Sequence, residues 1–243
     1  MIDQEKIIGT STMSSAVEFA NNYNQWVLSK FQKYISGNIL EVGTGKGVFK
    51  KWIKPTDSFV SIDIDKVIID NAKRKDPNGI YFQADIAEKS VIILLKNYHF
   101  QTVLCFNVLE HIEEDDKAIE NMLKLLDKNG NLLLFVPAFP ILFNNKDKLA
   151  GHLRRYSKNS LRNKLRLHNN IEITKIEYFN PIGAIGYLAN KFVKHRSLNN
   201  KSIRFQTKIF DKYLVSLSKA INPITANFFG QSLVCVIQKN KSQ

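Results

Sequence analysis

Ile39-Leu40-Glu41-Val42-Gly43-Thr44-Gly45-Lys46-Gly47 is the stretch that decides the fold of this 243-residue chain. A buried strand is predicted to run into a glycine-rich turn, and a helix is expected at 47–53. Glycine permits positive φ and lets a ligand approach the backbone with no Cβ in the way. A helix that starts after the turn can donate N–H groups to that ligand. The stretch therefore predicts a nucleotide-binding turn.

Two nucleotide-binding interpretations of this turn conflict with its spacing. A phosphate-binding loop requires Gly-Lys followed by Ser or Thr, whereas Lys46 is followed by Gly47. The dinucleotide fingerprint Gly-x-Gly-x-x-Gly is disfavoured, because the third glycine comes one residue early and Glu41 precedes the first.

Strand-like and helix-like segments alternate along most of the chain. Strands are predicted at 38–42, 58–63, 80–83, 102–106, 132–136, 171–179 and 232–238; helices are predicted at 17–35, 47–53, 66–74, after Asp85, at 115–126 closed by 128–130, after 157–160, at 181–192 and at 204–221. Strands that are apolar on both faces and separated by helices indicate a parallel sheet covered on both sides. We therefore predict an α/β fold: a doubly wound, mostly parallel seven-stranded sheet with an N-terminal helix and a helical insertion before the last strand.

The size and composition suit a single globular domain. Apolar residues make up 44% and charged residues 23% of the chain, which excludes collagen-like and disordered classes. We expect one domain over 1–243, with a helical lead-in at 15–36 and a helical insertion or lid at 181–229.

Polar residues follow successive strands at the edge where open α/β sheets bind ligands. Asp63 ends the second predicted strand, where a carboxylate can accept both hydroxyls of a ribose. Asp85 follows the third strand and is placed to accept from an adenine amino group, with Ile64 and Ile86 covering the ring faces. Asn107 follows the fourth.

Together these residues resemble the signature of the class I S-adenosylmethionine-dependent methyltransferases, which have a Rossmann-like fold. The matching positions are Glu41, Gly43, Gly45 and Gly47, followed by Asp63 and Asp85. Phe106-Asn107-Val108-Leu109-Glu110-His111-Ile112 and Val136-Pro137-Ala138 are similar to the branch near the ubiquinone-type O-methyltransferases. Gly151-His152-Leu153-Arg154-Arg155-Tyr156 is similar to a subgroup associated with glycan or lipid modification.

The resemblance implies S-adenosylmethionine as cofactor and assigns its contacts. Glu41 and the turn of Gly43, Thr44, Gly45 and Gly47 would hold the methionine end, Asp63 the ribose, Asp85 the adenine, and Asn107 with Val108 would line the sulfonium. Alternatives remain for some of them. Asp63 competes with Asp65 for the N-cap of the next helix, Asp85 is also placed to cap the helix after it, and Tyr23 and Trp26 either cover the cofactor or belong to the core.

Methyl transfer to a hydroxyl requires in-line geometry and usually a base. His111 and His152 are the catalytic candidates, because imidazole titrates near neutrality. His152 is favoured, and Arg154, Arg155 and Tyr156 beside it are expected to grip a phosphate or carboxylate of the substrate. The structural alternatives are a helix-start residue for His111 and a solvated basic segment for His152.

The resemblance also narrows the acceptor. Asn107 is followed by Val108-Leu109 instead of the Pro-Pro-aromatic motif of nucleobase amino methyltransferases, and neither cysteine follows a proline as in cytosine-carbon enzymes. We therefore expect O-methylation of a small-molecule, lipid-linked or saccharide acceptor.

The net charge of +13 is concentrated in two segments. Residues 145–166 carry eight basic side chains against one acidic, and residues 191–212 carry seven against one. An anionic partner is expected, and a predicted helix at 204–221 with Phe205, Ile209, Tyr213, Leu214 and Leu217 on one side could lie on an anionic membrane. For this helix the alternative is a lid packed on the sheet. For the protein as a whole the alternatives to a methyltransferase are an RNA-binding or RNA-modifying protein that uses the basic surface, and a dehydrogenase.

The remaining expectations concern location and metals. No secretory signal is recognised, and the uncharged run at 220–238 is interpreted as a turn plus a strand, so a cytoplasmic protein is expected. Peripheral contact with the inner face of the membrane is compatible with that expectation. Cys105 and Cys235 give neither metal spacing nor a disulfide framework, and no metal site is predicted.

Overall fold

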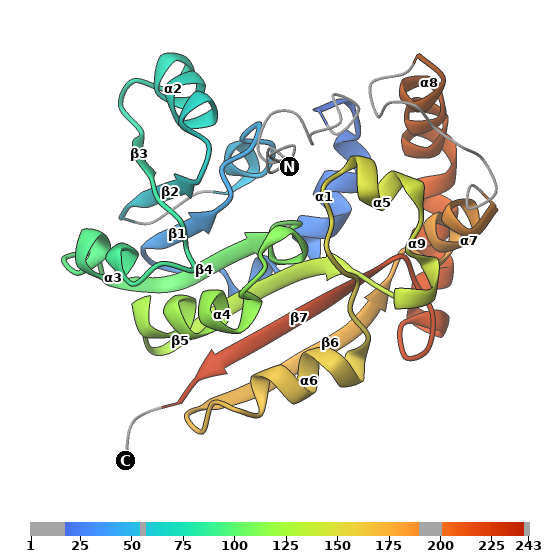
Figure 1. The fold of residues 1–243 in the computed structure, drawn as a ribbon. Coiled ribbons are helices and arrows are strands. Elements are labelled where there is room, and N and C mark those ends of the chain that lie inside the picture. Colours follow the sequence, from blue (N-terminus) through green and yellow to red (C-terminus); the bar gives the residue numbers. More distant parts are fainter. Residues whose placement is uncertain (1–17, 54–56, 190–200, 241–243) are drawn as a thin grey trace, which may run out of the picture.

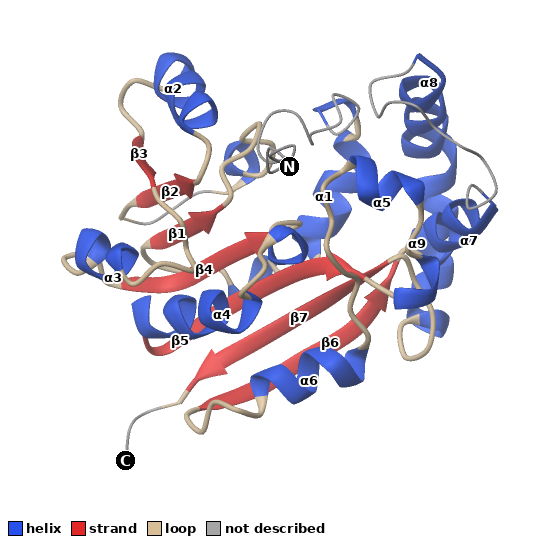
Figure 2. Ribbon diagram, in the orientation of Figure 1, coloured by secondary structure: helices blue, strands red, loops and turns tan. Residues whose placement is uncertain are grey.

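The computed structural model describes residues 18–53, 57–189 and 201–240, with the backbone alone described at 201–204 (Figure 1). Its centre is one seven-stranded sheet (Figure 2). The strands are β1 (Ile39–Val42), β2 (Phe59–Asp63), β3 (Ile80–Gln83), β4 (Phe100–Phe106), β5 (Leu126–Pro137), β6 (Ile171–Phe179) and β7 (Ser232–Lys239).

The strand order is β3-β2-β1-β4-β5-β7-β6, with β6 at one edge. The pairs from β3 to β5 are parallel, whereas β7 runs antiparallel to both of its neighbours. The predicted doubly wound, mostly parallel sheet is therefore confirmed. Because the order reverses direction beside β1, the carboxyl ends of β1 and β4 meet at the point where such sheets bind ligands.

Helices cover both faces of the sheet. They are α1 (Asn21–Ser29), α2 (Lys66–Lys75), α3 (Ser90–Leu95), α4 (Asp115–Leu125), α5 (Asn145–Leu149), α6 (Lys158–Leu165), α7 (Pro181–Ala189), α8 (Lys201–Ile209) and α9 (Val215–Thr225), with shorter turns η3 (Gln32–Tyr34), η4 (Lys50–Trp52), η5 (Leu109–His111), η6 (Pro140–Leu142) and the π-helical η8 (Phe210–Leu214). In Figure 1, α3, α4 and α6 cover the near face. The apolar side chains of α1 and α9 pack with the cluster on the other face.

The strands supply side chains to two separate cores because successive residues of a strand point to opposite faces. In β5, Leu132 and Leu134 pack with the helices of one face, whereas Leu133 and Phe135 pack with the other. Burial on both sides explains why this strand is a continuous apolar run instead of an alternating one.

Local backbone conformation changes two predicted elements. The helix expected at 47–53 is reduced to the single turn η4, and its expected first residue, Gly47, has a left-handed φ of 67° that a right-handed helix does not accept. Asn129, expected in a helix cap at 128–130, lies in β5 with a φ of 63°, where the pairing with β4 shifts register. The segment after Pro140, for which no helix or strand is predicted before 157–160, contains η6 and α5.

The predicted insertion packs directly on the N-terminal helix. Segments α8, η8 and α9 follow one another without a break, so the helix expected at 204–221 extends over 201–225. Asp211 of η8 accepts hydrogen bonds from the backbone N–H groups of Asn22 and Tyr23, and so supplies the first turn of α1 with an acceptor. The side chain of Asn180 accepts from Gly183 N–H (2.9 Å) at the start of α7 and so supplies an acceptor to its first turn.

Parts of two predicted helices and of one basic segment lie outside the described residues. These are 15–17 of the lead-in, 190–192 of the helix expected at 181–192, and 191–200 of the second basic segment.

Candidate functional site

The glycine turn after β1 is folded against the ends of β2 and β4. Gly43 N–H donates to Ile62 O (2.8 Å), and Gly43, Gly45 and Gly47 all have positive φ. A Cβ on Gly43 would lie 2.2 Å from Val108 Cγ2. Glycine at this position therefore allows the turn to contact the residue that follows Asn107.

Asp63 faces this turn from the end of β2. One carboxylate oxygen accepts from Gly45 N–H (3.1 Å) and the other from Asp65 N–H (3.0 Å). Asp65 itself caps α2 by accepting from Val67 N–H (2.8 Å), so the capping alternative applies to Asp65 and not to Asp63. Burial raises the pKa of Asp63, and lone pairs of its carboxylate remain available for a ligand.

Glu41 lies beneath the turn. It is buried and accepts a hydrogen bond from Ser61 Oγ (2.9 Å). Burial raises the pKa of its carboxyl to about 7. Glu41, Thr44 and Gly45 line a cavity of about 410 Å³ that extends to Lys50 and Tyr81. Thr44 Oγ1 is buried and has no hydrogen-bond partner among the described residues, as expected of a group that meets a ligand.

The three residues predicted to contact the adenine differ in how accessible they are to a ligand. Asp85 accepts from Ala87 N–H (2.8 Å) within a turn, whereas α3 begins only at Ser90, so Asp85 does not cap that helix. Ile64 is exposed and free to cover a ring, but Ile86 already packs in the core. The expectation that both isoleucines flank an adenine fits Ile64 better than Ile86.

Asn107 and the aromatic residues of α1 also differ in position. Asn107 is exposed after β4 with a φ of 54°, and its N–H donates to Phe135 O (2.7 Å). Tyr23 and Trp26 pack in the core with Phe179, and burial raises the pKa of Tyr23 to about 12. The core alternative therefore describes these two aromatic side chains.

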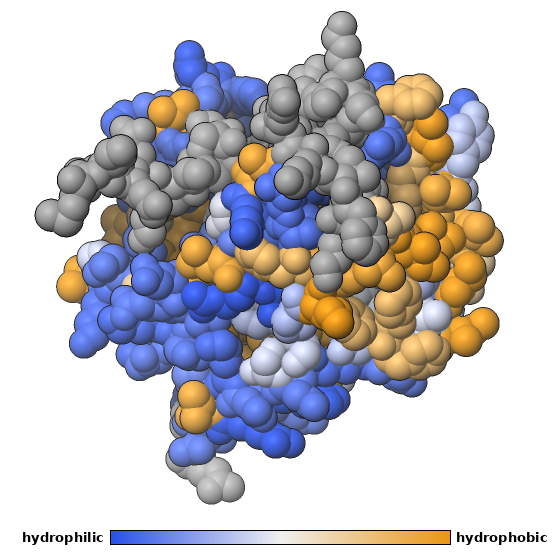
Figure 3. All heavy atoms as spheres, turned by 45° about the vertical axis from the view of Figure 1, so that its right-hand side comes forward, coloured by the Kyte–Doolittle hydropathy of each residue, from blue (hydrophilic) through white to orange (hydrophobic). Residues whose placement is uncertain are grey.

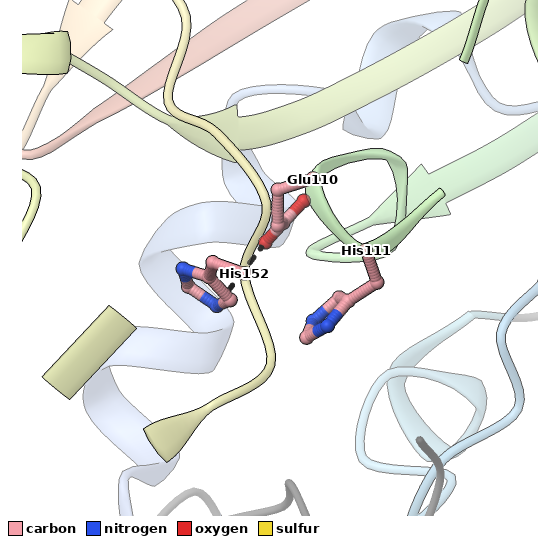
Figure 4. Close-up of side chains that lie close together, drawn as sticks. All are labelled: Glu110, His111 and His152. Carbon is pink, nitrogen blue, oxygen red and sulfur yellow. Dashed lines mark ion pairs between the residues drawn. The ribbon is translucent and has the colours of Figure 1, made fainter. Parts of the chain in front are cut away.

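The two predicted catalytic histidines lie together although a whole strand separates them in the sequence. The ring centroids of His111 and His152 are 4.8 Å apart, and Glu110 lies beside them (Figure 4). His111 belongs to η5, directly after Asn107 and Val108, and its N–H donates to Val108 O (2.9 Å). Burial lowers the pKa of the His111 imidazole to about 4.

His152 is oriented by a buried carboxylate. Its Nδ1 lies 2.8 Å from Oδ1 of Asp147, and the same oxygen accepts from Arg155 Nε (2.9 Å). Burial alone would raise the pKa of Asp147, but the hydrogen bond with His152 and the charge of Arg155 lower it below its usual value. An ionised Asp147 favours a proton on Nδ1 and leaves Nε2 of His152 with its lone pair.

Glu110 is fully buried at the centre of this group. His152 Nε2 lies 3.8 Å from its Oε1, which is too long for a hydrogen bond. Burial raises the pKa of the Glu110 carboxyl to about 7.

The three residues expected to grip a substrate anion have partners within the protein. Arg155 is buried, donates to Ala138 O and lies 4.1 Å from the Tyr187 ring centroid, in addition to its contact with Asp147. Tyr156 is buried and donates to Asp115 Oδ2 (2.8 Å). Arg154 pairs with Asp115 (2.8 Å). Because Arg155 and Tyr156 are buried with their polar atoms engaged, these two side chains hold the loop that carries His152. Arg154 is partly exposed, and its contact with the substrate stays a prediction.

Other cations of the 145–166 segment are also engaged. Lys164 pairs with Asp115 and Asp116, and Lys158 donates to the carbonyls of Ala226 and Asn227. Much of the charge expected to meet an anionic partner is therefore neutralised or solvated by the protein itself.

Sequence reasoning missed Glu110, Asp147 and Asp115. Glu110 stands next to a predicted histidine, which was an available signal. Asp147 is the one acidic residue of a basic segment, and Asp115 begins α4, so both suggested ordinary surface positions.

Comparisons with known proteins agree with this geometry. A family described as "Methyltransferase domain" matches residues 21–181. No curated protein matches the chain.

Many solved structures share the fold. One is the N-methyltransferase NodS from Bradyrhizobium japonicum WM9 with S-adenosyl-L-homocysteine, which is 14% identical with a TM-score of 0.54 over 92% of this chain and 88% of that one. A putative methyltransferase (BH2331) from Bacillus halodurans C-125 is 17% identical with a TM-score of 0.57 over 88% and 99%. The [4+2]-cyclase SpnF is 16% identical with a TM-score of 0.54 over 91% and 81%. At these identities the likeness shows the fold alone.

Proposed function

Since the chain belongs to the methyltransferase-domain family and is an S-adenosylmethionine-dependent methyltransferase, we propose that it methylates a hydroxyl oxygen of a small-molecule, lipid-linked or saccharide acceptor. The sequence similarity of the 106–112 segment to the ubiquinone-type O-methyltransferases supports oxygen as the attacked atom. The arrangement of acid and base groups beside the donor site supports it further.

The residues at the donor site fit an adenosyl sulfonium. Positive-φ glycines open the turn to a ligand, and Gly47 has nothing within 4 Å of a Cβ position. Asp63 has accepting capacity for ribose hydroxyls, and Thr44 Oγ1 lacks a partner among the residues described. Glu41 adds a negative charge near the methionine end when it is ionised. We assign donor binding to these residues together with Asp85, Ile64 and Asn107.

One observation carries the placement of the acceptor. Val108 packs against Gly43 of the donor turn, and the next turn of the same segment brings Glu110 and His111 to His152. The basic atoms of this group therefore lie directly after the residue that borders the donor site. An acceptor that enters from the His152 side meets these atoms and the donor together.

When bound, S-adenosylmethionine supplies an electrophilic methyl group, which the acceptor oxygen takes as the carbon–sulfur bond breaks, the electron pair stays on sulfur and the hydroxyl proton is lost. The protein must orient that hydroxyl, exclude water and accept the proton that the hydroxyl loses. Glu110, His111 and His152 are the groups placed to do so. Glu110 is buried and the two histidines are partly buried, which limits the access of bulk water to the transfer.

The helical insertion offers a surface for a lipid-linked acceptor. Its buried side packs Val215 in the core and also carries the polar residues Asp211, Ser218 and Asn222, which are hydrogen-bonded to the rest of the protein. Its outward side is apolar, and Figure 3 shows hydrophobic residues gathered on this part of the surface. The exposed side chains there include Phe205, Ile209, Tyr213, Leu214, Leu217, Ile224 and Phe228.

We propose that this face rests on an anionic membrane, with Lys208, Lys212 and Lys219 near the headgroups. The described helices are too short or too polar to cross a bilayer, so the contact proposed is peripheral. We also propose that the chain is a single domain over 1–243 and that the insertion at 181–229 is part of it. The hydrogen bonds between Asp211 and α1 support this proposal.

Calorimetry with S-adenosyl-L-homocysteine and transfer of a labelled methyl group to a cell extract test the proposal. We expect saturable binding and a labelled product whose methyl group is attached to oxygen, as shown by mass spectrometry. Absence of binding would refute the donor site, whereas a methylated amine or carbon would refute only the acceptor assignment. The same calorimetry with NAD tests the dehydrogenase alternative, and RNA affinity with a steep salt dependence but no methyl transfer would favour RNA binding.

A further inference from the structure

Three side chains beside the donor site form a group that can hold a metal ion. One ligand atom from each of Glu110, His111 and His152 lies within 4.8 Å of the others (Figure 4). Glu110 and His111 come from η5, and His152 comes from the loop after α5. Two imidazoles and one carboxylate are a ligand set that proteins use for zinc and other first-row divalent metals.

Glu110 provides the second observation that points to a cation as the ligand of this group. Its side chain is fully buried, and neither carboxylate oxygen has a hydrogen-bond partner within the described part of the chain. Its nearest basic atom, His152 Nε2, is 3.8 Å away. A buried carboxylate is stable only when it is paired with a charge or bound to a metal. Both oxygens of Glu110 are available to bind a metal ion.

Both histidines are held with Nε2 available. Nδ1 of His111 lies 3.1 Å from Gly151 O, and because a carbonyl oxygen only accepts, Nδ1 carries the proton. Nδ1 of His152 lies 2.8 Å from Oδ1 of Asp147. Metal-binding histidines usually donate their second ring N–H to a carbonyl or a carboxylate in this way, which fixes the tautomer and the direction of the free nitrogen.

We propose that Glu110, His111 and His152 bind one divalent transition-metal ion of the zinc type. Bonds of about 2.0–2.2 Å in tetrahedral geometry separate ligand atoms by about 3.3–3.6 Å, so the group needs to contract modestly on binding. Three protein ligands leave a coordination position open for a hydroxyl or water oxygen. Asp147 and Arg155 support the site from behind by fixing His152.

The role of this ion in catalysis rests on the proposed O-methylation, although its binding does not. An acceptor hydroxyl in the open position would lose its proton more readily, because a divalent ion stabilises the alkoxide. With the ion bound, His152 is a ligand instead of the base expected from the sequence.

Metal binding by the full chain, freed of metal by a chelator and dialysis, tests the proposal. Zn²⁺ is titrated by calorimetry, and Co²⁺ is titrated by its visible absorption, which reports nitrogen and oxygen coordination. The wild-type protein is expected to bind one ion per chain by both methods. Glu110→Gln and His152→Ala are expected to lose this binding, and Asp147→Asn to weaken it about 10- to 100-fold.

His99→Ala is the matched control, because His99 is exposed and lies outside the group. It is expected to bind metal as the wild type does. Binding of S-adenosyl-L-homocysteine by each variant reports whether the fold and the donor site are intact. A wild-type protein that binds S-adenosyl-L-homocysteine but takes up no Zn²⁺ or Co²⁺ would overturn the metal site and leave the donor site intact. Unchanged metal binding by folded Glu110→Gln would also overturn the metal site.

Discussion

Oδ1 of Asp147 and Nδ1 of His152 lie 2.8 Å apart, so the orientation of a solvent-accessible histidine is set by a fully buried carboxylate. The same carboxylate accepts from the backbone N–H of Asn144 through Oδ2 and from Arg155 through Oδ1. Asp147 thus joins the start of α5 to the loop that carries His152. The contact makes His152 part of a rigid assembly.

Asp147→Asn should reduce turnover while donor binding stays unchanged. The amide has no charge to favour a proton on Nδ1 of His152, so we expect kcat to fall about 10- to 100-fold. Labelled methyl transfer and calorimetry with S-adenosyl-L-homocysteine measure the two effects. Asp116→Asn, at the exposed partner of Lys164, is the control and should keep full turnover. An equal fall in kcat in both variants would contradict a role of Asp147 in orienting His152 for catalysis.

Asp63→Asn should weaken donor binding. A hydrogen bond to a charged group contributes about 1.5–3 kcal/mol, so the dissociation constant of S-adenosyl-L-homocysteine should rise about 10- to 150-fold. Asp65→Ala, which removes the cap of α2, should instead lower the free energy of unfolding by about 1 kcal/mol without changing ligand affinity. The assignment of Asp63 to the ribose fails if the two variants bind the ligand equally well.

Gly43→Ala should abolish donor binding because its Cβ would lie 2.2 Å from Val108 Cγ2 in a residue with φ of 81°. Val108→Ala in the same chain should restore part of the binding, since it removes the clash but not the backbone strain. Gly47→Ala has open space for its Cβ in the protein without ligand, so the left-handed strain should cost about 1–2 kcal/mol of stability, and donor binding should weaken because that space faces the ligand. Calorimetry and thermal unfolding separate these outcomes.

Glu41→Gln should change how stability depends on pH. Burial raises the pKa of Glu41 from 4.5 to about 7, so between these values the unfolded chain has lost a proton that the folded chain keeps. The wild-type free energy of unfolding therefore falls as pH rises through this window, whereas the amide of the variant does not titrate and its contribution is constant. Urea unfolding should show the stability of the variant relative to wild type increasing with pH by up to about 3 kcal/mol. A difference that does not vary with pH would contradict a protonated Glu41.

Phe205→Ser with Leu217→Ser should reduce co-sedimentation with anionic liposomes at low salt. Both side chains are exposed on the apolar face of the helical insertion, and their removal takes away apolar area that would enter the bilayer boundary. Ile93→Ser on α3, which also replaces an exposed apolar residue, should leave co-sedimentation unchanged. Wild-type protein that stays in the supernatant with anionic liposomes would exclude this surface as a membrane contact.

The sequence by itself determined the sheet and the location of the donor turn. Apolar runs such as 132–136 report burial on both faces, and the end of each parallel strand lies at one edge of the sheet whatever the details of packing. Asp63 and the glycines were therefore recognisable from local sequence, because strand ends and turn conformations depend mainly on neighbouring residues. The prediction was wrong for the helix at 47–53, where Gly47 is left-handed and only the turn η4 forms.

Only the tertiary structure decided the acceptor side. Whether a charged side chain is buried depends on segments far away in the chain, so the contacts of Arg155 with Asp147 and of Tyr156 with Asp115 could not be predicted from the basic segment that contains them. The approach of Glu110 to His152 has the same origin, since one residue precedes β5 in the sequence and the other follows it, and packing instead of spacing joins them. Long-range packing places these groups together, and it makes Arg155 and Tyr156 part of the support of the loop that carries His152.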